Sequence, residues 1–158
     1  MTGEARAVAA LEASGIAHTL TRHGPVSSLA EAAAARGVRA DDIVKTIVVR
    51  RGEGDCLFVL VPGGRQISWP KLRALLGVNR LSLPDASQAR AVTGYERGTI
   101  TPFGSLASLP VIADATVAGR PLSIGAGAHG VAALVDADAL VAVLGATVAD
   151  VTDAVAEA

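Results

Sequence analysis

The chain of 158 residues has little cysteine, few aromatic residues and almost no net charge, and each of these shortages bears on the class of protein. Cys56 is its single cysteine, which excludes an intramolecular disulfide and a cysteine-rich zinc site and makes a reducing cytoplasm the expected location. Aromatic residues make up 3% of the chain, so the core must consist of small and branched aliphatic side chains. The formal net charge of −1 excludes a strongly basic nucleic-acid binder that works through bulk electrostatics. We therefore expect no DNA partner. The net charge does not exclude a protein that holds one end of a nucleic acid in a local pocket.

Long apolar runs and export signals are also absent from the sequence. No uninterrupted apolar run approaches the roughly 20 residues that cross a bilayer. The N-terminal segment 1–15 carries Glu4 and Glu12 among its apolar residues, where an export signal needs a basic region followed by an apolar core. We expect a soluble protein without a membrane partner. The three histidines lack the spacing of metal ligands, and neither a metal nor a cofactor is expected.

What the sequence does contain is an irregular mixture of strand and helix patterns. The β-branched run Ile43–Arg50 and the apolar run Cys56–Val61 flank a glycine-containing turn and predict a hairpin. Helices with their caps are expected at residues 4–15, 28–37, 68–77, 85–92 and 136–145, and further short strands at 18–23, 111–113, 122–124, 131–135 and 147–151. This pattern favours one α/β domain over residues 1–158, with a mixed, barrel-like sheet and surrounding helices.

Two local signals in the helices are specific enough to test. Ser28 followed by Glu31 is a capping-box signature at the start of the second helix. Leu72, Leu75 and Leu76 have the spacing of one apolar face on the third helix.

The stretch Thr93–Asp114 departs from both periodicities and is a loop by composition. Gly94, Gly98 and Gly104 permit backbone conformations and close approaches that side chains would block. A segment of this length without regular structure is often functional. A well-packed connector is the alternative interpretation.

Lys45 interrupts an apolar, β-branched strand, where an ammonium group has to reach a cavity, a partner or the surface. The chain has two lysines and twelve arginines, so the choice of lysine at this position stands out. A compact cation on a flexible stem suits a phosphate or a carbonyl oxygen in a tight pocket. The alternative is a half-exposed strand on which Lys45 is simply solvated.

The segment Gly125–Gly130 lies between two predicted strands and contains His129. Small residues let a ligand approach the backbone, and a histidine can donate, accept or titrate near neutral pH. The spacing is not that of a dinucleotide-binding loop, and a surface hairpin turn is the alternative. Cys56 has no adjacent base and is interpreted as a structural thiol.

The order and spacing of these features carry a resemblance that no single one of them would carry. The segments are Lys45-Thr46, Thr93–Gly98, Thr101–Gly104, Leu109–Asp114, Gly125–Gly130 and Gly145–Asp150. Over nearly its whole length the chain resembles the YbaK/ProX family. That family comprises free-standing aminoacyl-tRNA deacylases and the editing domain inserted in bacterial prolyl-tRNA synthetases.

The resemblance implies a compact α/β domain on a mixed, barrel-like sheet and hydrolysis of the ester between a wrong amino acid and its tRNA. It implies that Lys45 positions the tRNA 3′ end through phosphate or ester oxygens, and that the Gly98 amide stabilises the oxyanion. Tyr95 would pack to fix the loop, as would Phe103. No nucleophilic side chain is then needed, because water or a substrate group can attack. The substrate-binding residues implied are Thr46, Thr101, Pro102, Phe103, Gly104, Gly127 and His129.

The implied substrate is the acceptor end of an aminoacyl-tRNA, most simply tRNA(Pro) carrying Cys, Ala or another small residue, and a prolyl-tRNA synthetase is a candidate partner. Cysteine-specific members commonly have a basic turn where this chain has Gly127–Gly130. Alanine-specific members pair the lysine with Asn where this chain has Thr46. Two other hypotheses stay open: a non-catalytic module that binds an acceptor end or a small ligand, and a plain structural or interaction domain.

Overall fold

The computed structural model describes residues 1–155 and contains nine strands and five α-helices in that range. The strands are β1 (Thr19–Arg22), β2 (Ile43–Gly52), β3 (Asp55–Pro62), β4 (Arg65–Ile67), β5 (Val111–Asp114), β6 (Pro121–Gly125), β7 (Val131–Asp136), β8 (Thr147–Ala149) and β9 (Thr152–Ala154). The α-helices are α1 (Gly3–Ser14), α2 (Leu29–Arg36), α3 (Trp69–Leu76), α4 (Ala86–Thr93) and α5 (Ala137–Leu144), and two short 3₁₀ helices are η1 (Ala40–Asp42) and η2 (Ala115–Val117).

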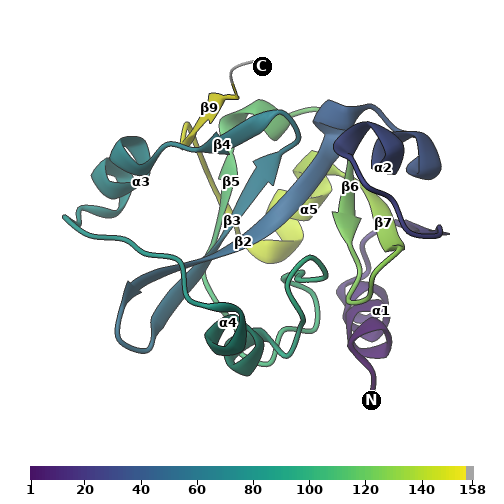
Figure 1. Cartoon of the computed structure of the whole chain (residues 1–158), viewed down its shortest axis with the longest axis horizontal. Coiled ribbons are helices and arrows are strands. Elements are labelled where there is room, and N and C mark those ends of the chain that lie inside the picture. The colour runs from purple at the N-terminus through teal and green to yellow at the C-terminus, as the bar shows by residue number, and fades with distance from the viewer. Residues whose placement is uncertain (156–158) are drawn as a thin grey trace.

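Seven strands form one mixed sheet in the order β1-β7-β6-β2-β3-β5-β8. The hairpin of β2 and β3 is antiparallel, whereas β2 with β6, β3 with β5 and β5 with β8 are parallel. The predicted single α/β domain with a mixed sheet is confirmed. Within residues 1–155 the ladder ends at β1 and β8, and α5 lies behind β2, between β5 and β6 (Figure 1). No helix of this range has both the length and the apolar composition that a membrane crossing requires.

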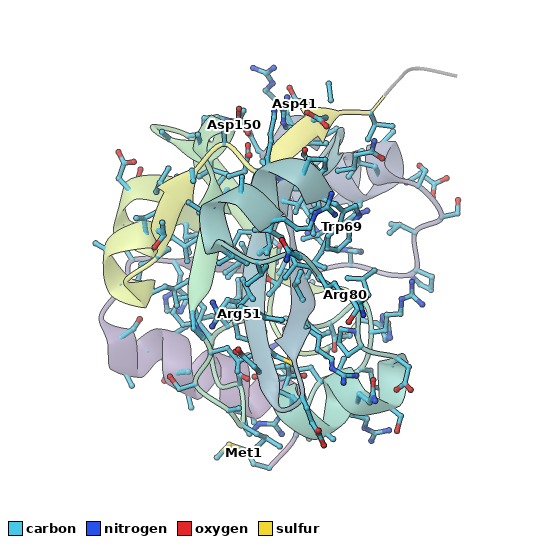
Figure 2. The ribbon with its side chains drawn as sticks, turned by 90° about the vertical axis from the view of Figure 1, so that its left-hand side faces the viewer. Met1, Asp41, Arg51, Trp69, Arg80 and Asp150 are labelled. Atoms are coloured by element: carbon cyan, nitrogen blue, oxygen red, sulfur yellow. The ribbon has the colours of Figure 1, made fainter. Side chains whose placement is uncertain are left out.

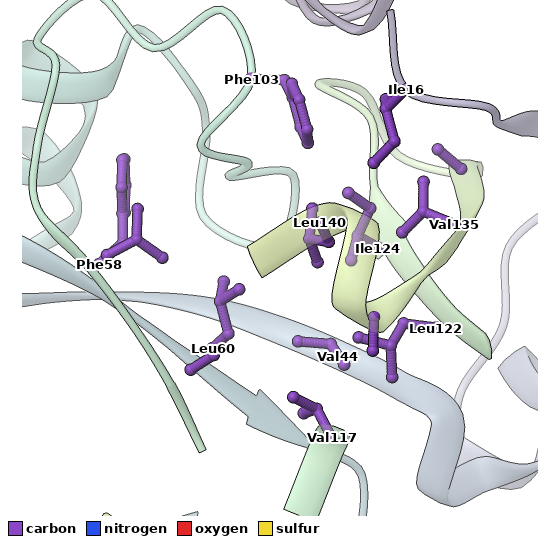
Figure 3. Packing of buried hydrophobic residues seen from close by; sticks show 14 of the residues in the cluster. Ile16, Val44, Phe58, Leu60, Phe103, Val117, Leu122, Ile124, Val135 and Leu140 are labelled. Atoms are coloured by element: carbon purple, nitrogen blue, oxygen red, sulfur yellow. The ribbon is translucent and has the colours of Figure 1, made fainter. Parts of the chain in front are cut away.

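The larger core lies on the side of the sheet that carries α5. Leu140 of α5 is 1% exposed and lies among aliphatic side chains of five strands (Figure 3). Phe58 and Phe103 are the aromatic members of this cluster, which is otherwise aliphatic as the composition predicts. Full burial of each such side chain stabilises the fold by about 1.5–3 kcal/mol.

The opposite side of the hairpin is covered by α3. Leu72 of this helix is fully buried against Val49, Leu57 and Val59, and Trp69 packs at the margin of this cluster (Figure 2). The prediction of one apolar face needs a correction, because Leu75 is 43% exposed. This eight-residue helix buries only the centre of its apolar stripe against the hairpin.

The helix ends follow the predicted chemistry with one correction. The Ser28 hydroxyl accepts a hydrogen bond from the Glu31 amide, 3.0 Å away, as a capping box requires. The Glu31 carboxylate instead accepts from the amide and hydroxyl of Ser27, one residue earlier than expected. A complete capping box is present at α4, where Asp85 and Gln88 each accept from the other's backbone amide.

Candidate functional site

Strand β2 has a neighbour on only one side over five of its residues. Strand β6 pairs with β2 at Ile43 and Val44 alone, and Ser82 rejoins that edge at Arg50 through two backbone hydrogen bonds of 2.7 and 3.0 Å. Between these points, and as far as the structure describes the chain, Lys45–Val49 pair with β3 only. Because alternate residues of a strand direct their backbone groups to alternate edges, β2 presents unpaired amides and carbonyls along this stretch.

A groove of about 890 Å³ lies along this free edge. Consecutive residues of β2 line it although their side chains alternate between faces, as expected for a hollow at an edge. In Figure 1, α2 lies near one end of β2 and α4 lies below its other half, and both helices contribute to the walls. The rest of the lining comes from residues 26–28 and 83–85, the turn at residues 97–98, Ile100 and Gly125.

Lys45 lies on the same face of β2 as Ile43, because residues two apart in a strand share a face. Ile43 packs against Ala32 and Ala33 of α2, so Lys45 lies just beyond the surface that the helix covers. The Lys45 side chain is exposed and lines the groove. No carboxylate of the described residues lies within 4.0 Å of its ammonium group.

Gly98 lies in a tight turn that also lines the groove. The Thr99 amide donates to the Glu96 carbonyl at 2.9 Å, and Gly98 has φ +88°. Since Arg97 does not have positive φ, this is the geometry of a type II turn, whose third position favours glycine. Within residues 1–155 the Gly98 amide has no hydrogen-bond acceptor, so it is free to donate to a ligand.

Thr46 also lines the groove but points to the other face of β2, the face of Val44 and Val48. Its Oγ1 is buried and has no hydrogen-bond partner among the described residues. A buried hydroxyl without a partner is unfavourable, so Thr46 is a ready contact for a ligand that reaches it.

The predicted residues of the segment 101–104 lie behind the Gly98 turn and do not line the groove. Phe103 is in the core, Thr101 is 1% exposed and accepts from the Phe103 amide at 3.3 Å, and Pro102 begins the next turn. Gly104 abuts the backbone of α1, where an added Cβ would lie 2.6 Å from the Arg6 carbonyl oxygen. The structure places these four residues as support, and their predicted contact with substrate stays a prediction.

Tyr95 and α1 hold this support in place. The buried Tyr95 hydroxyl donates to the Phe103 carbonyl at 2.7 Å. Burial raises the pKa of this hydroxyl although Arg6 opposes the shift, so Tyr95 stays a neutral donor. The Arg6 guanidinium lies 4.8 Å from the Tyr95 ring centroid and donates to the carbonyls of Gly94 and Gly104 at 2.8 and 3.3 Å.

The segment Gly125–Gly130 is the hairpin turn between β6 and β7, and it also contacts the Gly98 turn. An added Cβ on Gly98 would lie 3.5 Å from Cε1 of His129, and Nε2 of His129 is 3.7 Å from the Glu96 carboxylate. The His129 side chain is 72% exposed. Gly127 packs against the backbone of Gly3 in α1 and does not line the groove.

Cys56 lies in β3 opposite Arg50 and does not line the groove. Burial raises the pKa of its thiol, which leaves little reactive thiolate at neutral pH. Across residues 1–155 no group of three or more His, Cys, Asp or Glu side chains has the geometry to hold a metal ion.

A family model described as an aminoacyl-tRNA editing domain matches residues 23–143. The chain belongs to this family. The editing domain is 37% identical over 92 residues to a proline–tRNA ligase from Desulfovibrio desulfuricans, and 31% identical over 90 residues to one from Trichlorobacter lovleyi. The two matches cover 58% and 57% of this chain but 16% of each ligase.

A solved structure is similar to nearly the whole chain. The crystal structure of a candidate trans-editing enzyme for prolyl-tRNA synthetase matches the editing domain with a TM-score of 0.85 and 27% identity, over 97% of this chain and 99% of that one. The family model and this structure both identify the chain as an aminoacyl-tRNA editing domain, and the sequence matches relate it to a part of proline–tRNA ligases.

Two basic residues of the editing domain's groove were missed by sequence reasoning. Arg36 and Arg97 line the groove with Lys45, whereas Asp85 is the one acidic residue that residues 1–155 contribute to its walls. In the sequence Arg36 is the last residue of a predicted helix, a common position for a basic side chain. Only the packing of α2 against Ile43 of β2, with the hydrogen bond from Arg36 to Ser123 of β6, brings it to the groove.

Proposed function

We propose that this editing domain is a deacylase that hydrolyses the ester of mischarged aminoacyl-tRNA in trans. Its proposed substrate is tRNA(Pro) carrying Cys, Ala or another small residue. The observation that carries the proposal is that one groove brings together Lys45, without a carboxylate partner in the described chain, and the unpaired Gly98 amide. The similarity to proline–tRNA ligases supports tRNA(Pro), and the match to a free-standing structure supports action in trans.

In the proposed reaction Lys45 holds a phosphate or ester oxygen of the tRNA 3′ end, and the Gly98 amide faces the ester carbonyl oxygen. Water adds to the carbonyl carbon, negative charge develops on the carbonyl oxygen, and the Gly98 amide stabilises it. The bond from carbonyl carbon to ribose oxygen then breaks. The ribose oxygen takes the proton that the water loses, which gives a free amino acid and an uncharged tRNA.

The type II turn is well suited to this role because it fixes the amide before the substrate arrives. An oxyanion donor is effective only when it does not have to reorganise during the reaction. Phe103, Tyr95 and Arg6 supply the rigid support behind the turn. His129 lies beside Gly98, and we assign it to contact with the aminoacyl group.

The test is hydrolysis of Cys-, Ala- and Ser-charged tRNA(Pro) by the purified protein and by Lys45→Ala. We expect the protein to shorten the ester half-life of at least one of them, and Lys45→Ala to lower that rate roughly 100-fold or more. Arg39→Ala is the matched control, because it removes the same charge from a side chain that is 81% exposed and outside the groove.

The possible outcomes separate the hypotheses. Ester half-lives that the parent protein leaves unchanged would contradict the proposal. Saturable binding of charged tRNA without turnover, weakened by Lys45→Ala, would instead indicate a non-catalytic binding module. Melting curves of each variant show whether a loss of rate is a loss of fold.

A further inference from the structure

Arg36, the last residue of α2, is a partly buried cation in the groove that lacks an anionic partner among the described residues. Its Nε donates to Nε2 of His23 at 3.3 Å, and its Nη1 donates to Oγ of Ser123 at 3.3 Å. Within residues 1–155 no carboxylate oxygen lies within 4.0 Å of the guanidinium. Both partners are therefore hydrogen-bond acceptors that orient Arg36 without neutralising it.

The His23 ring is neutral in this arrangement. A guanidinium can only donate, so Nε2 of His23 must accept, and the ring hydrogen lies on Nδ1. Nδ1 is 2.8 Å from the Gly24 carbonyl, which accepts that hydrogen. The His23 amide donates to the Gly130 carbonyl at 2.9 Å, which fixes His23 to the turn that follows β6.

A buried cation without a counter-ion is unfavourable unless a ligand supplies the anion. Burial lowers the pKa of the Arg36 guanidinium, but an arginine in a protein stays charged at neutral pH. Arg120, by comparison, lies 2.9 Å from the buried carboxylate of Asp42. The fold thus supplies a carboxylate to Arg120 and supplies none to Arg36 within the described residues.

The register of the sheet puts Arg36 on the same side of the groove as Lys45. Ser123, which holds Arg36, is paired with Ile43 of β2. Ile43 packs against α2 and shares its strand face with Lys45. Both cations therefore lie at the end of the groove where β6 leaves β2.

We propose that Arg36 binds a backbone phosphate of the single-stranded acceptor end of the tRNA, beside the group that Lys45 holds. The inference rests on the proposed function, which supplies the ligand class. Arg36 needs an anion, and the phosphodiesters supply the negative charge of an aminoacyl-tRNA. The aminoacyl end itself carries a positively charged amino group. Nη2 of Arg36 makes no hydrogen bond in the described structure, and its fixed fork matches the geometry of phosphate oxygens.

The experiment measures binding of an uncharged, 5′-labelled oligoribonucleotide that ends in CCA, by fluorescence anisotropy between about 50 and 200 mM salt. We expect Arg36→Gln to weaken binding about tenfold. The slope of log affinity against log salt should fall by about 0.7, the value for one lost phosphate contact to a single strand. Affinity for adenosine, which has no phosphate, should not change.

Arg36→Lys keeps the charge and should retain the salt slope while it recovers part of the affinity. Arg39→Gln, an exposed arginine outside the groove, should leave both quantities unchanged. The proposal is overturned if Arg36→Gln binds the oligonucleotide as the parent does, if the parent does not bind it, or if adenosine binding weakens equally. Failure of the proposed deacylase activity is separate, because it is read from ester hydrolysis and not from this binding curve.

Discussion

Asp114 and Arg36 both place a charge inside the fold, but their surroundings differ. Asp114 is fully buried and its carboxylate accepts from the amides of Thr116 and Val151, each at 3.1 Å, and from the Thr116 hydroxyl. The Arg65 guanidinium lies 3.8 Å away. Arg36 has two neutral partners and no carboxylate in the described chain. A charge surrounded by complementary groups holds the chain together, whereas a charge left without them is available to a ligand.

The surroundings of Asp114 connect distant parts of the sequence. Asp114 ends β5, Val151 precedes β9, and Arg65 begins β4, so one carboxylate joins the main sheet to the two-stranded sheet. Burial alone raises the pKa of this carboxyl, but the hydrogen bonds from Thr116 and Val151 outweigh it and the pKa lies below its ordinary value. The charged form is therefore the one that stabilises the fold.

The largest effect is expected from Asp114→Asn. An amide group would direct a donor at neighbours that are themselves donors, so the free energy of unfolding at pH 7 should fall by about 3 kcal/mol. Chemical denaturation of both proteins measures this difference in the free energy of unfolding. Asp136→Asn is the control, because this exposed residue caps α5 and Asn caps a helix as well as Asp. If Asp114→Asn lowers the free energy of unfolding no more than Asp136→Asn does, Asp114 is not a structural charge and its contrast with Arg36 is wrong.

The same substitution predicts a pH dependence. Because the folded-state pKa of Asp114 is depressed, its contribution is fully present above the unfolded carboxyl value of about 4 and is lost as pH falls through the folded pKa. The stability difference between the parent and Asp114→Asn should therefore shrink as the solution is acidified below about pH 4. A difference that is constant from neutral to acidic pH would show that the charge of Asp114 contributes nothing.

At the groove, Gly98→Ala should lower the deacylation rate roughly tenfold while costing about 1 kcal/mol of stability, since φ +88° disfavours a side chain and the amide would shift. Gly64→Ala is the matched control, because Gly64 has φ +77° with no atom within 4 Å of an added Cβ and lies outside the groove. It should show a similar stability loss with an unchanged rate. Equal rates in the two variants would remove Gly98 from the proposed mechanism.

Local sequence signals predicted much of the fold. The hairpin of β2 and β3 follows from β-branched residues around a turn, and the helices follow from caps such as Ser68 and Asp136 together with glycine stops. The pairing of β4 with β9 was not predicted. Each strand has three residues, and Arg65 and Ala154 are far apart in sequence, so no local pattern indicates that they meet.

The sequence could propose candidate site residues but not the groove that brings them together. Lys45 and Gly98 became candidates because a lysine in an apolar strand and a glycine in an irregular loop are visible in the sequence, and the resemblance supplied roles that stay predictions; in the structure both residues line the groove. The groove arises where β6 separates from β2 after Val44, which is a property of the folded sheet. The position of Arg36 in that groove therefore needed the structure, as did the separation of Phe103 from it.

The smallest effect is expected at Arg6, another of the arginines that have no carboxylate partner in the described chain. Its guanidinium is satisfied by two carbonyls and the Tyr95 ring, so we class it with Asp114 as structural. Arg6→Gln should lower stability by about 1 kcal/mol and deacylation a few-fold, because the support behind Gly98 loosens. The salt slope of oligonucleotide binding should stay at the parent value, as it should for the exposed control Arg90→Gln. If the salt slope of Arg6→Gln falls as much as that of Arg36→Gln, Arg6 also contacts a phosphate. Hydrogen bonds to carbonyls would then not be enough to identify an arginine as structural.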